Sequence, residues 1–120
     1  MTRRALIIDD SKMIRDVFSL QLATCGFEAQ SCDSLDKTLN IIQNWQPTVV
    51  FLDLQMPNHD GFEVIKQIQA KFSAPPKIVA VTGNDSDLVR RQADSMGFDR
   101  FLLKPFRTLE LTALLDDLLS

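Results

Sequence analysis

The sequence has few of the residues on which several common protein chemistries depend. His59 is its only histidine, and Cys25 and Cys32 are its only cysteines. Two unpatterned cysteines are too few for a disulfide framework or a zinc site, and one histidine gives little material for zinc ligation or a serine–histidine triad. We interpret both cysteines as small core or surface residues, and His59 as a loop residue rather than a phosphate carrier.

Long hydrophobic runs and a basic charge excess are also missing. Uninterrupted apolar runs stay far below the roughly 20 residues needed to cross a bilayer, and no charged-then-apolar signal segment opens the chain. The formal net charge is −3, whereas association with nucleic acid depends on a basic face. We therefore expect a cytoplasmic protein that contacts neither a membrane nor nucleic acid directly.

What the chain does contain is an alternation of short apolar runs and amphipathic segments. Its 120 residues, 45% hydrophobic and 24% charged, suit a single domain over residues 1–120. Apolar runs predict strands over residues 5–8, 27–32, 48–52, 78–81 and 100–103, of which the second is more polar and suits an edge. Helical spacing predicts helices over 11–25, from 33 or 34 through 42, over 61–72, from 85 or 86 to about 96, and over a last segment with Leu111, Leu114, Leu115 and Leu118.

The ends of these helices carry capping residues. Either Ser11 or Asp10 can cap the first helix, where Met13, Ile14, Val17, Phe18 and Leu22 stand at helical spacing. The second and fourth helices offer a similar choice between a serine and the aspartate beside it. Gly26 and Gly97 stand where left-handed residues end the first and fourth helices.

Strands that alternate with helices, most of them continuous apolar runs, predict a parallel sheet covered on both faces. The expected fold is therefore a doubly wound α/β sandwich with five strands and five helices. Because crossovers are right-handed, both faces are covered only if the winding reverses, and the reversal opens a crevice at the carboxyl ends of the strands. The first and third strands are the expected neighbours of that crevice.

Polar residues follow four of the five strands at this edge. Asp9 and Asp10 come after the first strand, Asp53 after the third, Thr82 after the fourth and Lys104 after the fifth. Two carboxylates about 4 Å apart repel by roughly 4 kcal/mol at an effective dielectric constant near 20, so three of them need positive charge nearby. The lysine offsets one of these negative charges. The negative charge that remains, in a site that offers only oxygen ligands, suits Mg²⁺ or Mn²⁺.

With these residues in view, the sequence resembles the CheY-like receiver domains of bacterial two-component response regulators. The resemblance covers the whole chain. It rests on the Asp9-Asp10 pair, on Asp53 followed by Met56-Pro57 and Gly61, on Thr82, and on the run Phe101-Leu102-Leu103-Lys104-Pro105. It implies the flavodoxin-like strand order 2-1-3-4-5.

The resemblance also implies a role for each site residue. Asp53 would accept a phosphoryl group from a sensor histidine kinase or a histidine phosphotransfer protein. Asp10 and Asp53 would bind Mg²⁺ through their carboxylates, Asp9 directly or through water, and Gln55 through its backbone carbonyl. Lys104 and the Thr82 hydroxyl would hold phosphoryl oxygens.

A switch and an output surface are implied in the same way. After phosphorylation Thr82 would move toward the phosphoryl group and Phe101 would turn into the space behind it, remodelling the surface of the fourth helix, fifth strand and fifth helix. This surface would serve a partner protein, a fused output domain or a homodimer. Its charges are mixed: Arg90, Arg91, Arg100 and Arg107 stand among Asp87, Asp94 and Glu110. The Lys104–Pro105 bond is a candidate cis peptide.

Two other classes fit the residues less well. A phosphatase of the haloacid dehalogenase type shares the nucleophile, lysine and Mg²⁺, but needs a second aspartate where Gln55 stands. A dinucleotide-binding domain needs a glycine-rich turn where Asp9-Asp10-Ser11-Lys12 stands. Gln55 and Asn84 flank the expected water path to an acyl phosphate, and neither is a built-in general base. The donor, the target, and the choice between a free-standing receiver and a piece of a larger regulator stay open.

Overall fold

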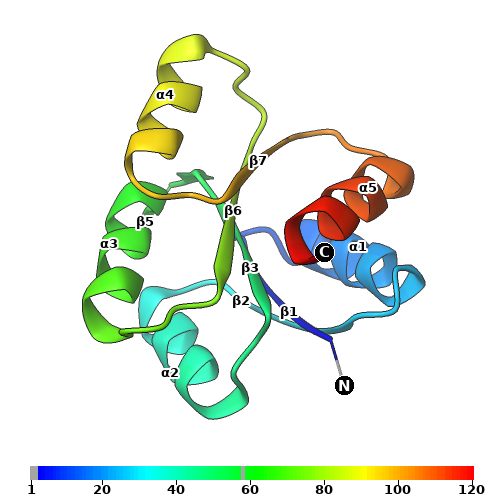
Figure 1. Ribbon diagram of the computed structural model, residues 1–120, viewed down its shortest axis with the longest axis horizontal. Helices are drawn as coiled ribbons and strands as arrows, with labels where there is room; N and C mark the ends of the chain where they lie inside the picture. The colour runs from blue at the N-terminus through cyan, green and yellow to red at the C-terminus, as the bar shows by residue number, and fades with distance from the viewer. Residues whose placement is uncertain (1–2, 58) are drawn as a thin grey trace.

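The computed structural model describes residues 3–57 and 59–120, and a five-stranded parallel sheet forms its centre (Figure 1). Its strands are β1 (Arg4–Ile8), β2 (Glu28–Cys32), β3 (Val49–Asp53), β6 (Lys77–Thr82) and β7 (Arg100–Leu103). They lie in the order β2-β1-β3-β6-β7, with all four neighbouring pairs parallel. Counted along the main sheet this is the predicted order 2-1-3-4-5, so the doubly wound fold is confirmed.

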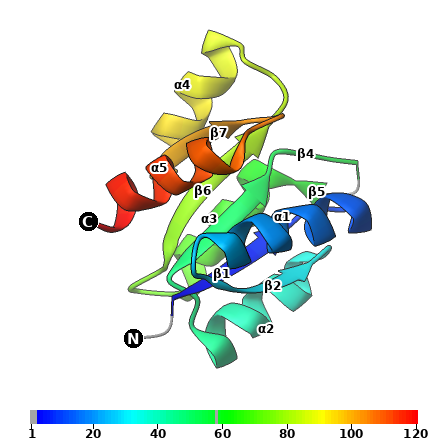
Figure 2. The same cartoon turned by 90° about the vertical axis from the view of Figure 1, so that its right-hand side faces the viewer.

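Four helices connect these strands, and a fifth follows the last strand. They are α1 (Lys12–Thr24), α2 (Leu35–Trp45), α3 (Gly61–Lys71), α4 (Asp87–Ser95) and α5 (Thr108–Leu119). Figure 1 shows α2, α3 and α4 on one face of the sheet and α1 and α5 on the other, and Figure 2 looks onto the α1 and α5 face. Within residues 3–57 and 59–120, we find no helix with the length and apolar content that a membrane crossing requires.

Side-chain alternation along the strands builds a separate core on each face. Val50 and Leu52 of β3 belong to the cluster under α2, α3 and α4, whereas Val49 and Phe51 belong to the cluster under α1 and α5. All four are fully buried, with at most 1% of their surface exposed. Because β3 is covered on both faces, its apolar run is continuous rather than alternating, as a buried parallel strand requires.

Serine side chains begin three of the helices. In each case left open by the sequence, the serine and not the aspartate beside it caps the helix: Ser11 for α1, Ser34 for α2 and Ser86 for α4. Each hydroxyl accepts a hydrogen bond from a backbone N–H that has no partner inside the helix. Gly26 and Gly97, at φ +85° and +94°, follow α1 and α4 in the left-handed conformation that glycine adopts without strain.

A short hairpin after β3 was not predicted. Its strands, β4 (Gln55–Met56) and β5 (His59–Asp60), are antiparallel and only two residues long, too short for a periodic pattern. The sequence predicts a loop here from Pro57, Asn58 and Gly61, of which Asn58 lies outside the described residues. A Cβ atom at Gly61 would lie 2.9 Å from Cδ2 of Leu54, so the close return of this loop explains the glycine.

The apolar stripe predicted on α1 is only partly core. Phe18 and Leu22 are buried, but Met13, Ile14 and Val17 are 75%, 38% and 54% exposed. The predicted helix is confirmed, and its helical spacing does not by itself show which of these apolar residues are buried. These three side chains lie at the end of α1 nearest the carboxyl edge of the sheet.

Candidate functional site

Strand alternation aims three charged side chains to one side of the sheet. Asp9, Asp53 and Lys104 each stand two residues beyond a side chain of the core under α1 and α5. Thr82 stands two residues beyond Ala80, which belongs to the opposite core. Since alternate residues of a strand face the same way, the two carboxylates and the ammonium converge, and the hydroxyl is directed toward the α4 side.

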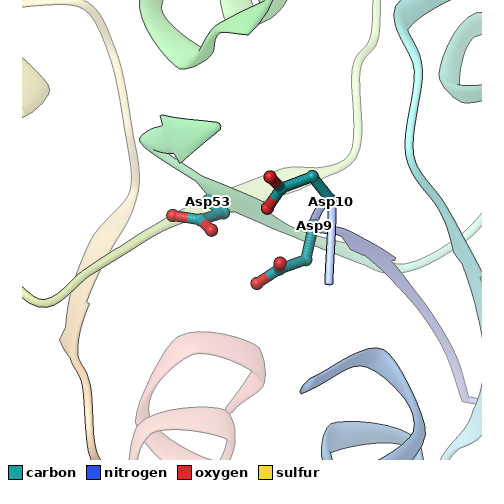
Figure 3. Close-up of side chains that lie close together, drawn as sticks. All are labelled: Asp9, Asp10 and Asp53. Carbon is teal, nitrogen blue, oxygen red and sulfur yellow. The ribbon is translucent and has the colours of Figure 1, made fainter. Parts of the chain in front are cut away.

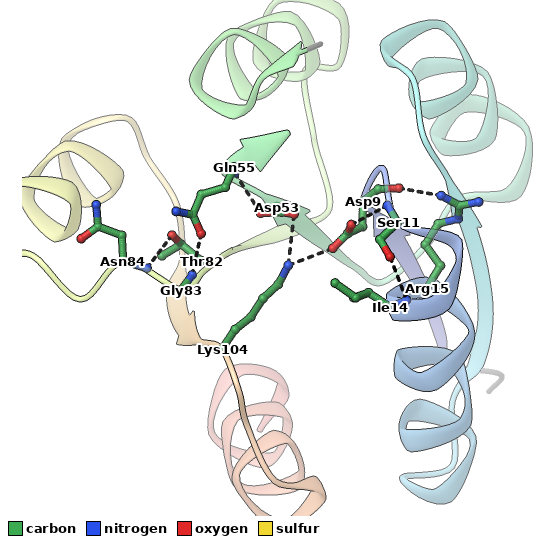
Figure 4. Close-up of polar contacts among 10 residues, drawn as sticks. All are labelled: Asp9, Ser11, Ile14, Arg15, Asp53, Gln55, Thr82, Gly83, Asn84 and Lys104. Atoms are coloured by element: carbon green, nitrogen blue, oxygen red, sulfur yellow. Dashed lines mark hydrogen bonds and ion pairs between the residues drawn. The ribbon is translucent and has the colours of Figure 1, made fainter. Parts of the chain in front are cut away.

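The ammonium group of Lys104 bridges the two carboxylates (Figure 4). Its Nζ lies 3.0 Å from Oδ2 of Asp9 and 3.1 Å from Oδ2 of Asp53. The other carboxylate oxygens accept backbone N–H groups, that of Asp9 from Ser11 and that of Asp53 from Gln55, both at 2.9 Å. Every oxygen of these two carboxylates therefore has a partner, although the residues are only 2% and 4% exposed.

Asp10 adds a third carboxylate to the cluster (Figure 3). One oxygen each from Asp9, Asp10 and Asp53 lies within 4.8 Å of the others, and Asp10 alone of the three is exposed. Within the described part of the chain, the Asp10 carboxylate forms no ion pair or hydrogen bond. At 4.8 Å two unit charges repel by about 3 kcal/mol at an effective dielectric constant of 20. Three carboxylates against one ammonium leave a deficit that fits a hard divalent cation on the exposed side.

The pKa values differ between the two buried aspartates. Burial raises the pKa of Asp53 and prevails over the hydrogen bonds from Gln55 and Lys104. Burial acts in the same direction on Asp9, but the Ser11 N–H and Lys104 outweigh it and lower the pKa of that carboxyl. At Lys104 burial is outweighed by the two carboxylates, which raise its pKa. Lys104 thus stays charged, and of the two buried carboxyls Asp53 has the higher pKa.

A second loop reaches the site from the end of β6. Thr82 is fully buried, and its hydroxyl accepts a hydrogen bond of 3.0 Å from the backbone N–H of Asn84. The N–H of Gly83 donates to the side-chain oxygen of Gln55 at 2.8 Å. Among the described residues, no hydrogen bond joins the Thr82 hydroxyl to Asp53 or Lys104. The structure therefore brings Thr82 beside the charged cluster without connecting it.

Sequence reasoning missed two polar contacts at the site. It gave Gln55 a backbone carbonyl ligand and a place beside the water path but no side-chain partner, because the bond to Gly83 depends on how the hairpin after β3 folds back. It did not select Arg15, whose Nη1 donates to the backbone oxygen of Asp9 at 2.8 Å and fixes the turn into α1. No spacing distinguishes Arg15 from an ordinary surface arginine.

The backbone around Lys104 also shapes the site. The Lys104–Pro105 peptide bond is cis, the isomer expected there. Lys104 and Pro105 also line an apolar groove of about 450 Å³ between α1 and the segment after β7. Met13 and Val17, two of the exposed apolar residues of α1, lie on its other wall. The groove and the charged cluster therefore share one residue, Lys104.

Comparisons with known proteins agree with this geometry. The family model described as the response regulator receiver domain matches residues 5–116. A CheY-like receiver domain from Methylobacillus flagellatus is 29% identical, with 98% of this chain and 99% of that chain covered and a TM-score of 0.87. A signal receiver domain from Bermanella marisrubri is 28% identical over 100% of both chains, with a TM-score of 0.91.

A chemotaxis protein, CheY4 of Vibrio cholerae, is also similar in structure. It is 26% identical, with 99% of this chain and 100% of that chain covered and a TM-score of 0.88. The family match and these structures give no support to a phosphatase of the haloacid dehalogenase type.

Proposed function

Because the chain belongs to the response regulator receiver domain family, we propose that it is a switch whose phosphoacceptor is Asp53. The observation that carries this proposal is the contact between Lys104 and Asp53, an ammonium 3.1 Å from a buried carboxylate of raised pKa. Phosphoryl transfer needs positioning and neutralisation of charge more than covalent assistance. A basic carboxylate beside a fixed cation supplies both.

The donor in this proposal is a phosphohistidine of a sensor kinase or phosphotransfer protein. An oxygen of Asp53 attacks the phosphorus atom, the P–O bond forms as the P–N bond breaks, and the imidazole leaves with the bonding electron pair. Lys104 then contacts a phosphoryl oxygen, and the Thr82 hydroxyl donates to another. The product is an acyl phosphate, so the protein is a phosphoacceptor rather than an enzyme acting on a separate substrate.

The same carboxylates support a proposal of Mg²⁺ binding. Asp10 and Asp53 would hold the ion with the backbone carbonyl of Gln55, and Asp9 would do so directly or through water. When bound, the ion offsets the negative charge of the carboxylates and of the incoming phosphoryl group. Asp10 is suited to this role because its carboxylate is exposed and has no partner in residues 3–57 and 59–120.

The apolar groove beside Lys104 suggests where the donor docks. A phosphohistidine can reach Asp53 only if the donor covers the rim of the site, and α1 forms that rim. Met13 and Val17 expose apolar side chains there, next to Pro105. An amphipathic donor helix with an apolar face would cover this groove and place its histidine over the carboxylates.

Output is proposed on a second surface, which includes α4 on the opposite face of the sheet. Thr82 would move toward the phosphoryl group and Phe101 would turn inward, changing the surface formed by α4, β7 and α5. Phe101 is half-buried, which leaves room for a detectable change in its exposure. This surface would bind a partner protein, a fused output domain or a second copy of the chain.

The test of Asp53 is intact mass and native gel mobility after incubation with Mg²⁺ and a small phosphoryl donor. We expect a labile single phosphoryl adduct on the wild-type protein and none on Asp53→Asn. A mobility change that accompanies the adduct would identify self-association as the output. An adduct of equal yield on Asp53→Asn, or no adduct on either protein, would contradict the proposed phosphoacceptor.

A further inference from the structure

Arg90 of α4 stacks on the ring of Phe101. The guanidinium carbon lies 4.4 Å from the ring centroid, the shortest of the four cation–π contacts that the described residues make. Nε of the same side chain lies 2.7 Å from Oδ1 of Asp85. One arginine therefore joins a half-buried ring on β7 to a carboxylate in the loop before α4.

That loop is connected to Thr82 by short hydrogen bonds. The Asn84 N–H donates to the Thr82 hydroxyl at 3.0 Å, and the Asn84 side-chain oxygen accepts the Ser86 N–H at 3.1 Å. Ser86 in turn caps α4. Asp85 therefore lies between Asn84, which is hydrogen-bonded to Thr82, and Ser86, which is hydrogen-bonded to Asn84.

Sheet register places Phe101 on the same face as Thr82. Phe101 pairs with Ala80, and Leu103 pairs with Thr82. Paired residues of neighbouring strands face the same way, as do alternate residues of one strand. Phe101 and Thr82 therefore lie on the α4 side of the sheet as diagonal neighbours on adjacent strands.

From these contacts we propose that Arg90 is a latch that holds Phe101 at the surface until the loop of Asp85 moves. The proposal rests on the proposed function, in which phosphorylation draws Thr82 toward Asp53. In the unphosphorylated protein, Asp85 fixes the guanidinium and the guanidinium fixes the ring. Movement of the loop shifts Asp85, the stack opens, and the ring turns toward the vacated space.

The latch opposes activation, so its removal should change the affinity for a phosphoryl mimic in a defined direction. A contact present in only one of two states shifts their equilibrium by its own free energy, so its removal favours the other state. For a cation–π contact at a partly exposed site, the shift is about two- to tenfold. Arg90→Ala is therefore expected to bind a phosphoryl mimic more tightly than the wild-type protein.

The test is a titration with beryllofluoride and Mg²⁺, combined with fluorine NMR of protein that carries 4-fluorophenylalanine at position 101. We expect Arg90→Ala to raise the apparent affinity about two- to tenfold and to move the fluorine signal of the unliganded protein toward that of the liganded protein. Arg90→Lys keeps the charge without the planar guanidinium and should give a smaller shift in the same direction. Arg91→Ala is the matched control, since Arg91 adjoins Arg90 on α4 and is also exposed.

A second background tests whether the effect passes through the ring. In Phe101→Leu, the substitution Arg90→Ala should no longer change the affinity, because the stacking partner is gone. Three outcomes would overturn the latch but not the proposed function. They are an equal gain in affinity from Arg90→Ala in the Phe101→Leu protein, an unchanged or weaker affinity of Arg90→Ala itself, and the same gain in Arg91→Ala. Failure of the wild-type protein to bind the mimic would overturn the proposed function, and the latch with it.

Discussion

The side chain of Gln55 spans the mouth of the site and accepts a hydrogen bond of 2.8 Å from the backbone N–H of Gly83. It thereby ties the hairpin after β3 to the loop after β6 that holds Thr82. Any movement of Thr82 that displaces Gly83 must stretch or break this bond. Gln55 is thus both a neighbour of Asp53, the proposed phosphoacceptor, and a restraint on the loop that the proposal expects to move.

Replacement of this side chain should loosen the loop. Gln55→Met keeps the length of the side chain but offers Gly83 no oxygen. Because both residues are exposed and water can replace the bond, we expect a stability loss of only about 0.5 kcal/mol. The Gly83 amide should exchange its hydrogen about threefold faster, as measured by NMR. Gln67→Met, which removes an exposed contact to Glu63 on α3, should leave that rate unchanged, and an equal rate in Gln55→Met would refute the restraint.

Loss of Asp10 should remove metal binding while stabilising the metal-free protein. Asp10→Asn relieves repulsion within the carboxylate cluster, and because Asp10 is exposed we expect a gain of about 1 kcal/mol or less. The wild-type protein should gain about 2.7 kcal/mol at Mg²⁺ concentrations one hundred times the Kd, and the variant almost nothing. Thermal melts with and without Mg²⁺ measure both effects. Asp16→Asn on α1, which removes an exposed ion pair with Lys12, should keep the metal response; an equal Mg²⁺ response in Asp10→Asn would contradict the site.

Asp53 should make stability depend on pH with a definite sign. Burial raises its pKa in the folded protein above the ordinary value of 3.8, so the folded state favours the protonated carboxyl. The contribution of this group to the free energy of unfolding is fully present below pH 3.8 and is lost as pH rises through the folded-state pKa. At pH 7 the buried charge therefore destabilises the fold, and Asp53→Asn should be more stable by about 1 kcal/mol. Denaturant unfolding between pH 7 and pH 4 should show this advantage shrinking as pH falls. A constant difference would show that charge is not its cause.

The apolar groove leads to a separate prediction on the donor. Val17→Asp places a charge on its α1 wall, where desolvation beneath a donor helix would be costly. Phosphotransfer from a phosphohistidine protein should slow about tenfold, whereas labelling by a small phosphoryl donor should not change. Leu20→Asp is the control, because Leu20 is 71% exposed on the same helix but does not line the groove. Equal slowing in both variants would place the docking surface elsewhere.

Much of the fold could be predicted because buried parallel strands are continuous apolar runs. The predicted strand limits are wrong where backbone hydrogen bonding continues beyond the apolar run. β6 was expected over residues 78–81 but extends from Lys77 to Thr82, since pairing continues through polar residues at both ends. On α1, helical spacing predicted the helix but did not specify which of its apolar residues are buried, and Met13 and Val17 are exposed beside the groove. A surface that binds a partner carries the same pattern as a core.

The residues of the charged cluster could be predicted, because the order of the strands in the sheet determines which strand-end residues lie at the same edge. Asp9, Asp53 and Lys104 are 44 or more positions apart in the chain, yet parallel strands bring their carboxyl ends together. Contacts made by long side chains were not predictable. The bond of Gln55 to Gly83 and the stack of Arg90 on the Phe101 ring depend on rotamers and loop paths that residue types do not specify.

The division of side chains between the two faces of the sheet has a steric consequence for complex formation. The carboxylates and the α1 groove lie on one side, while Phe101 and its contact with α4 lie on the other. In the proposal, a donor seated on α1 would leave α4 uncovered but would lie beside α5, which packs against α1. A target that contacted α4 alone could then bind while the donor is in place, whereas a target that also needed α5 would compete with the donor.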